Sequence, residues 1–204
     1  MHHKEATRKQ REEHILRSLK RFDYLTRGQI QAIHDLKSDR NAQRVLKQME
    51  DYVNILKDGE NIYYLNSKGR EIANCEKIRK STGNIQHFIM RNHLYIACGC
   101  PQNWRNEIRI KSEGRTKKEN IVCVADALFT KGDAYTIVEV DNTQKMKKNQ
   151  LKIEKYRELK QRGTFGFMAP TFLWITTSEY RRKELLKLSH GLNTQVFLLS
   201  ELTN

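Results

Sequence analysis

Apolar residues recur at helical spacing through the first quarter of the chain. Residues 6–21 carry many charges, among which apolar side chains follow one another as on one face of a helix, at Ile15, Leu16, Leu19 and Phe22. Thr26 precedes Gln29 at the spacing of a capping box and predicts a short second helix that extends to about Asp35. Ser38 predicts the start of a longer third helix, whose apolar side carries Ala42, Val45, Leu46, Met49 and Tyr52.

A β-hairpin is predicted directly after the third helix. Residues 53–56 and 61–65 are rich in apolar and aromatic side chains, and the turn between them contains Asp58-Gly59. Three helices and a hairpin resemble the winged helix-turn-helix superfamily, on the segments TRGQIQAIHDL, SDRNAQRVLKQMEDYVNIL and YYLNSKGREIA. In such domains the second helix of the turn pair enters the major groove of DNA with its N-terminal residues at the base edges.

That resemblance implies a set of DNA-binding residues around the third helix. The base-reading candidates lie at its N-terminal end, and further basic residues are candidate phosphate contacts. The alternative is a small helical protein-interaction domain whose basic side chains are simply solvated. The candidates are Ser38, Arg40, Asn41 (as an adenine reader) and Arg44 for the bases, and Arg27, Lys47 and Lys57 for phosphates.

A polar segment divides the chain. Residues 75–83, CEKIRKSTG, are almost devoid of apolar side chains and end in Ser-Thr-Gly, which predicts a linker. We therefore place one domain in residues 1–75 and a second in residues 84–204, joined by a linker at about 76–83.

The second part alternates between helix and strand patterns. This order predicts an α/β domain with a mixed central sheet, and an α/β chain overall. The predicted elements are a helix at 84–98, strands at 104–110, 121–129 and 135–140, a helix at 146–161, a strand ending at 176, a helix at 179–188 and a strand at 195–199.

Three acids lie on the hairpin that the second and third of these strands form. Asp126 is on the first strand of the hairpin, and Glu139 and Asp141 end the other. Because side chains alternate along a strand, Glu139 and Asp141 point to the same side, and the pairing of the strands can bring Asp126 beside them. The pattern predicts a metal site or its remnant. The alternative is that the acids form ion pairs with neighbouring lysines.

The order of elements around these acids resembles the PD-(D/E)xK nuclease-like fold. The resemblance implies Asp126 and Glu139 as ligands of Mg²⁺ or Mn²⁺, and Asp141 would add a third carboxylate to them. An active deoxyribonuclease would use Lys152, on the following helix, as its catalytic lysine and Glu107 as a further acid. The chain has Ala-Asp where the fold family has Pro-Asp, and Asp141 where it has a lysine. The missing lysine favours a nuclease-like domain that has lost catalysis.

The helical block together with the motifs WRNE, ADA, EVD and KIEKY resembles the replication-relaxation family of plasmids and other mobile elements, over about residues 8–199. That resemblance implies a protein that binds double-stranded DNA in replication, relaxation or conjugative transfer. A second copy of the chain and a replication or relaxase protein are the further partners that it implies. Two alternatives remain: a metal-dependent DNA endonuclease or nickase, and a transcriptional regulator.

The charge balance also indicates a polyanionic partner. The 204 residues include 38 Lys and Arg against 24 Asp and Glu, which gives a formal net charge of +14. Nucleic acid is the polyanion that such a balance fits best. No stretch approaches the roughly 20 apolar residues of a membrane span, and the start of the chain lacks an apolar signal-peptide core, so we expect a cytoplasmic protein without a membrane partner.

The cysteines and histidines show no metal-binding pattern. Cys98-Gly99-Cys100 is too closely spaced for the usual zinc motif, and Cys75 and Cys123 lie far from it, so we interpret all four as reduced thiols. Two histidines on the predicted helix at 84–98 are interpreted as packing residues rather than catalytic groups, His87 and His93.

Overall fold

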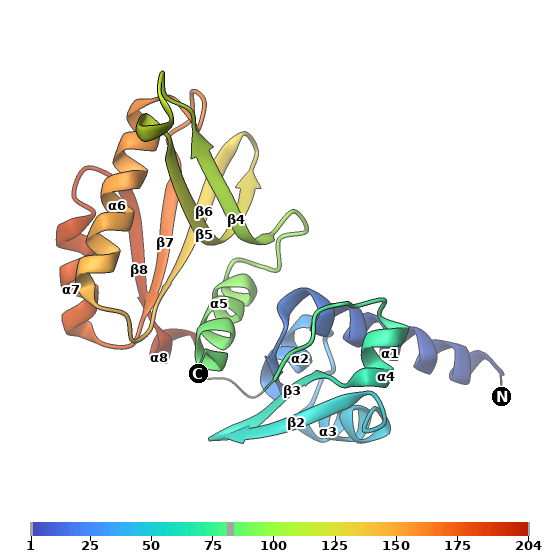
Figure 1. The fold of residues 1–204 in the computed structure, drawn as a ribbon. Coiled ribbons are helices and arrows are strands. Elements are labelled where there is room, and N and C mark those ends of the chain that lie inside the picture. Colours follow the sequence, from blue (N-terminus) through green and yellow to red (C-terminus); the bar gives the residue numbers. More distant parts are fainter. Residues whose placement is uncertain (1, 81–83, 204) are drawn as a thin grey trace. The chain divides into compact units, whose positions relative to one another are not determined.

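The computed structural model describes residues 2–80 and 84–203, which form two compact units (Figure 1). Unit 1 comprises residues 1–92 and unit 2 residues 93–204. The division falls later than the linker predicted at about 76–83, of which residues 81–83 lie outside the described residues. It falls within the helix α5 (Ile85–Ala97), whose first residues pack with Tyr24 and Ile62 of unit 1.

Unit 1 contains the three helices and the hairpin that the sequence predicts. Its small antiparallel sheet has the order β1-β3-β2, and the two-residue strand β1 and the short helix α4 were not predicted. The elements are α1 (His2–Phe22), β1 (Leu25–Thr26), α2 (Arg27–Ile33), α3 (Asp39–Gln48), β2 (Val53–Asp58), β3 (Glu60–Leu65), α4 (Ser67–Ile72) and the part of α5 that precedes residue 93.

The predicted caps of α2 and α3 are confirmed. The Thr26 hydroxyl accepts a hydrogen bond from the Gln29 backbone N–H at 3.2 Å, and the Gln29 side-chain oxygen accepts one from the Thr26 N–H at 3.3 Å. The amide nitrogen of Gln29 also donates to the Ile89 carbonyl at 2.9 Å, so the same side chain caps α2 and binds α5. Ser38 caps α3 by accepting from the Asn41 N–H.

The segment after α4 is held against unit 1, which explains why the division falls so late. Asp23 is buried in a left-handed conformation (φ 71°), and its carboxylate accepts a hydrogen bond from Arg79 Nε at 2.8 Å. The Tyr24 hydroxyl donates to the Lys80 carbonyl at 2.6 Å. Phe88 and Ile89 of α5 pack in the same cluster as Tyr24. Residues 76–80 and the start of α5 therefore belong to unit 1.

Unit 2 is built on a five-stranded sheet of order β4-β5-β6-β7-β8. The pairs β4–β5 and β5–β6 are antiparallel, and β6–β7 and β7–β8 are parallel, so the predicted mixed sheet is confirmed. Its elements are β4 (Arg105–Ser112), the 3-10 turn η1 (Lys117–Glu119), β5 (Ile121–Lys131), β6 (Ala134–Asp141), α6 (Met146–Gln161), β7 (Thr171–Thr176), α7 (Glu179–Leu188), β8 (Asn193–Leu198) and α8 (Leu199–Leu202).

Helices α6 and α7 lie side by side along the sheet (Figure 1). The core between them and the strands includes Tyr156 of α6, Leu185 of α7 and Trp174 of β7. The end of α5 packs through Tyr95, whose ring contacts Trp104 at a centroid distance of 5.3 Å. Burial of these aromatic and apolar side chains is the main force that assembles the unit.

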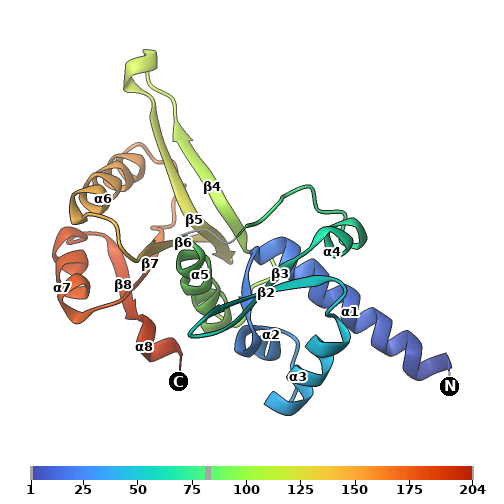
Figure 2. The same ribbon diagram turned by 60° about the horizontal axis from the view of Figure 1, so that its bottom comes forward.

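The β4–β5 hairpin is irregular at one position and extends beyond the rest of the sheet (Figure 2). Its ladder pairs residues on both sides of Glu107, but Glu107 itself has a left-handed backbone conformation (φ 54°). Beyond this position Ile121 and Cys123 of β5 pack with Ile153 and Tyr156 of α6. The outer half of the hairpin thus lies along α6.

The close approach of α4 to the turn after α3 generates a prediction. A Cβ at Gly69 would lie 2.0 Å from the backbone oxygen of Tyr52, whereas one at Gly28 would meet only the Thr26 hydroxyl at 3.8 Å. Gly69→Ala should therefore lower the free energy of unfolding by about 3 kcal/mol. The control Gly28→Ala should leave it unchanged or raise it by up to about 1 kcal/mol. Urea unfolding measures both, and equal stabilities would contradict the packing described for α4.

Candidate functional site

Helix α3 presents a row of cations on the side opposite its buried residues. Ala42, Val45 and Leu46 are buried against unit 1. Three residues that are predicted to contact DNA are exposed on the other side of the helix: Arg40, Arg44 and Lys47. A fourth, Lys57, is exposed on β2. The structure thus brings the predicted basic residues of α3 onto one solvent-facing surface.

Three other predicted DNA contacts are engaged in intramolecular bonds. Arg27 Nε lies 2.7 Å from the Asp39 carboxylate and ties α2 to the start of α3. The Asn41 amide donates to the Leu36 carbonyl at 2.8 Å, and its oxygen accepts from Arg44 Nη2 at 2.8 Å. With the Ser38 hydroxyl used as the cap, these side chains shape the start of α3 rather than extend from it.

Glu139 lies in the middle of unit 2 on β6, the central strand. Its carboxylate is buried, with 1% of the residue exposed, and both oxygens are bound by α6. Lys152 Nζ donates to one oxygen and the Tyr156 hydroxyl to the other. Because Lys152 and Tyr156 are four residues apart, they lie on the same face of α6 and hold Glu139 from one side.

Burial and a neighbouring acid control the ionisation of Glu139. Burial raises the pKa of Glu139 well above its ordinary value, and the charge of Asp126 raises it further, against the opposing effect of Lys152. Burial lowers the pKa of Lys152, but the charges of Glu139 and Asp126 outweigh that effect and leave it raised. Asp126 itself accepts a hydrogen bond from the Val140 N–H at 2.7 Å.

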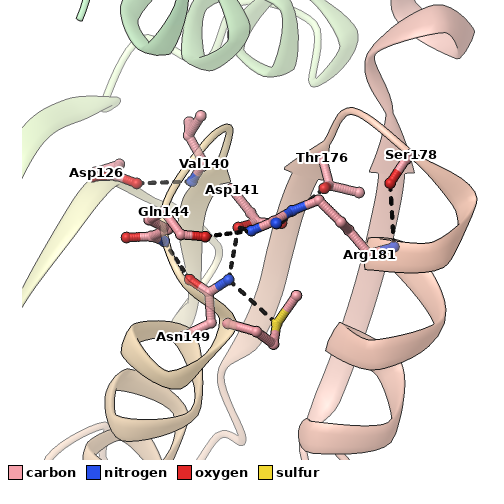
Figure 3. A network of polar contacts seen from close by, with 9 residues as sticks. Asp126, Val140, Asp141, Gln144, Asn149, Thr176, Ser178 and Arg181 are labelled. Atoms are coloured by element: carbon pink, nitrogen blue, oxygen red, sulfur yellow. Dashed lines mark hydrogen bonds and ion pairs between the residues drawn. The ribbon is translucent and has the colours of Figure 1, made fainter.

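Asp141, at the end of the same strand, belongs to a different network (Figure 3). It is fully buried, and Arg181 of α7 binds both its oxygens, Nε at 2.7 Å and Nη2 at 2.5 Å. Asn149 Nδ2 donates at 2.7 Å and the Thr176 hydroxyl at 2.8 Å. Arg181 also donates to the Gln144 carbonyl at 2.7 Å. Four donors therefore fill the hydrogen-bonding capacity of this carboxylate.

The predicted metal ligands do not fit a divalent cation in this arrangement. Asp126 and Glu139 lie near each other, but Glu139 is bound by a lysine and a tyrosine, and Asp141 is bound by an arginine. Within residues 2–80 and 84–203 no three His, Cys, Asp or Glu side chains gather as a metal site would require. Of the five predicted catalytic residues, the structure brings together Asp126, Glu139 and Lys152, while Glu107 lies exposed on β4.

Sequence reasoning missed several residues of these networks. Tyr156 could have been found, because it stands four residues after Lys152 in the KIEKY motif. Arg181 and Thr176 lie 40 and 35 residues from Asp141, and no local signal links them to it. Asn149, on the first turns of α6, is one polar position among many in the predicted helix at 146–161, and nothing local marks it as a partner of Asp141.

Cys123 lies beside the Glu139 network, where its side chain is hydrogen-bonded to Tyr156. All four cysteines are free thiols, and burial raises the pKa of Cys98 and Cys123. Burial lowers the pKa of His93.

In the described part of the chain, no helix combines the length and the apolar character needed to cross a membrane.

One of the comparisons with known proteins identifies a family. The family model described as replication-relaxation matches residues 16–171. No curated protein matches the chain. Among solved structures, the crystal structure of protein VC1899 from Vibrio cholerae is similar, with a TM-score of 0.42 and 11% sequence identity. The match covers 94% of this chain and 53% of that one, so the chain spans about half the length of that protein.

The Glu139–Lys152 pair predicts a pH-dependent stability. Lys152→Met should raise the pKa of Glu139 further, because its counterion is lost. When the pKa of a Glu is higher in the folded than in the unfolded state, the protonated carboxyl stabilises the folded state. That stabilisation is complete below the unfolded pKa, about 4.3, and is lost as the pH rises through the folded pKa. The variant should therefore be destabilised by about 3 kcal/mol at pH 8 and by less at pH 5.

Urea unfolding at both pH values measures this effect. The double variant Lys152→Met with Glu139→Gln is the control, because it removes the titrating carboxyl and should show no added pH dependence. Parallel pH profiles for the single variant and the unaltered protein would mean that Lys152 does not compensate the buried charge.

Proposed function

The chain belongs to the replication-relaxation family, and we propose from this premise that it is a DNA-binding protein of a plasmid or mobile element that acts in replication, relaxation or conjugative transfer. The observation that carries the proposal is the exposed basic face of α3. Double-stranded DNA is the proposed partner. A second copy of the chain or a replication or relaxase protein is proposed to join it on the DNA.

We assign α3 the role of the recognition helix of a winged helix-turn-helix domain. The capped pair α2 and α3 followed by the β2–β3 hairpin supports this assignment, since a major groove about 12 Å wide admits one helix. Arg40 and Arg44 are proposed to reach base edges, and Lys47 and Lys57 phosphates. Asn41 is reassigned from adenine reader to a positioning residue, because its side chain orients Arg44.

Unit 2 is proposed to act as a scaffold without catalysis. Both oxygens of Glu139 and of Asp141 are already bound by donors from α6, α7 and β7. A nuclease of this fold class would need acids that are open to a cation. The interior of unit 2 thus supports a structural rather than a catalytic use of its acids.

The basic face of α3 predicts the effect of a double substitution. Arg40→Ala with Arg44→Ala should weaken binding to a cognate duplex by at least about tenfold, since each good base contact contributes roughly 1–3 kcal/mol. Electrophoretic retardation with cognate and scrambled duplexes measures affinity and selectivity. Lys147→Ala with Lys148→Ala, which removes the same charge from exposed positions of α6, is the matched control and should retain selectivity. Unchanged selective affinity of the first variant would exclude α3 as the reader.

One observation favours an alternative, a metal-dependent DNA endonuclease or nickase. Asp126, Glu139 and Lys152 are close enough for their charges to interact, as the acids and lysine of such an enzyme would be. A third reading, a transcriptional regulator, would use the same face of α3. It is distinguished by whether the cognate site lies in a promoter or at an origin of replication or transfer.

The nuclease alternative is tested with supercoiled plasmid. With magnesium or manganese at millimolar concentration, the protein should leave the plasmid supercoiled, because the buried acids are bound by protein donors. Agarose gel electrophoresis separates supercoiled, nicked and linear forms. Nicking that requires metal and disappears in Glu139→Ala would show that unit 2 is catalytic and that the scaffold assignment is wrong.

A further inference from the structure

An unusual apolar group lies in the segment that connects α6 to β7. Phe167 is fully exposed, at 109% of its reference area, and the adjacent Met168 is 54% exposed. The neighbouring Phe165 is buried and contacts the ring of Phe172 at 6.4 Å between centroids. Buried Phe165 therefore anchors the segment, and Phe167 projects into solvent from a fixed base.

The tip of the β4–β5 hairpin is joined to the start of this segment. Arg162, at the end of α6, donates from Nη1 to the Glu119 carbonyl at 2.8 Å. Phe167 follows Arg162 by five residues, which can span at most about 18 Å. The hairpin tip and the exposed phenylalanine thus lie within the reach of a few nucleotides.

The hairpin tip exposes cations, whereas its acid, Glu119, forms hydrogen bonds within the tip. The Glu119 carboxylate accepts hydrogen bonds from the Arg115 N–H at 2.9 Å and from the Thr116 hydroxyl at 3.1 Å. The side chains of Arg115, Lys117 and Lys118 are exposed. Three cations against the one carboxylate of Glu119 give the tip a net positive charge, and the hydrogen bonds of Glu119 fix its backbone.

We propose that this surface, formed by Arg115, Lys117, Lys118, Phe167 and Met168, binds single-stranded DNA, with Arg162 as the residue that positions the hairpin tip beside Phe167. An unpaired base can stack on the exposed ring of Phe167 while the cations hold the flanking phosphates. In a duplex the base faces are covered by neighbouring pairs, so the exposed ring suits a single strand. The surrounding positive charge favours this polyanion over a neutral or basic protein surface.

This site goes beyond the proposed duplex binding and does not depend on α3. A protein with both sites could hold a recognised duplex and a strand released when that duplex opens. The two sites use different residues in different units, so each can be removed separately.

Fluorescence anisotropy of the full-length chain with a labelled oligothymidylate of about 12 nucleotides tests the proposal. Phe167→Ala should weaken binding by about fivefold or more, since stacking contributes roughly 1–3 kcal/mol per base. Phe167→Trp should retain the affinity. The control Tyr180→Ala removes another exposed aromatic ring, 74% exposed on α7, and should bind normally.

Two further variants separate the charge contribution and the two sites. Lys117→Ala with Lys118→Ala should reduce the dependence of log affinity on log salt by about 1.4, the value for two lost phosphate contacts on a single strand. Arg40→Ala with Arg44→Ala should lose duplex selectivity and still bind the oligothymidylate. Phe167→Ala should keep its duplex selectivity and lose affinity for the oligothymidylate.

Equal affinity of Phe167→Ala and the unaltered protein for the oligothymidylate would overturn the proposal, as would no measurable binding by the unaltered protein. If Phe167→Ala changes the oligomeric state in sedimentation and leaves single-strand affinity intact, the surface binds a second copy of the chain and the proposal fails. The affinity of the variant Arg40→Ala with Arg44→Ala for duplex DNA tests the proposed function and not the single-strand site.

Discussion

The structure of unit 2 depends on the neutralisation of two carboxylates that the central strand buries. Glu139 and Asp141 lie two residues apart on β6, with 1% and 0% of each residue exposed. A carboxylate transferred from water into such an environment without a partner is strongly destabilising. Lys152 of α6 and Arg181 of α7 supply the opposite charges. Each helix is therefore fixed on the sheet by an ion pair as well as by apolar packing.

The same constraint decides what these acids can do. A sheet that places acids on adjacent strands could have gathered them around a cation, and Asp126 beside Glu139 retains part of that geometry. The protein instead supplies its own cations, and the positive charge needed by Asp141 comes from an arginine with fixed bidentate geometry. The buried acids are thereby occupied within the fold, and contacts with the proposed DNA partner are left to exposed cations such as those of α3.

Most of the secondary structure could be predicted, because it depends on local signals in the sequence. The buried ion pairs could not be predicted, because their partners lie far apart in the sequence. The cap at Ser38 and the helix at 146–161 were predictable because capping and helical periodicity are local properties of the chain. The Arg181–Asp141 pair was not, because a charged residue in a sequence does not indicate which opposite charge it will meet. The same holds for Asp23 and Arg79, whose bond attaches the described start of the predicted linker, residues 76–80, to unit 1.

The cations divide into paired and exposed ones, which explains why net charge alone could indicate a nucleic-acid partner but not the surface proposed to bind it. Arg79, Lys152 and Arg181 neutralise buried acids, so their charges are compensated within the fold and contribute little to the field outside it. Arg40 on α3 and Lys117 on the hairpin tip are exposed to solvent. Phosphates can release counterions only at such exposed cations. The surfaces that can bind DNA are therefore those where basic residues remain after the buried acids have been paired.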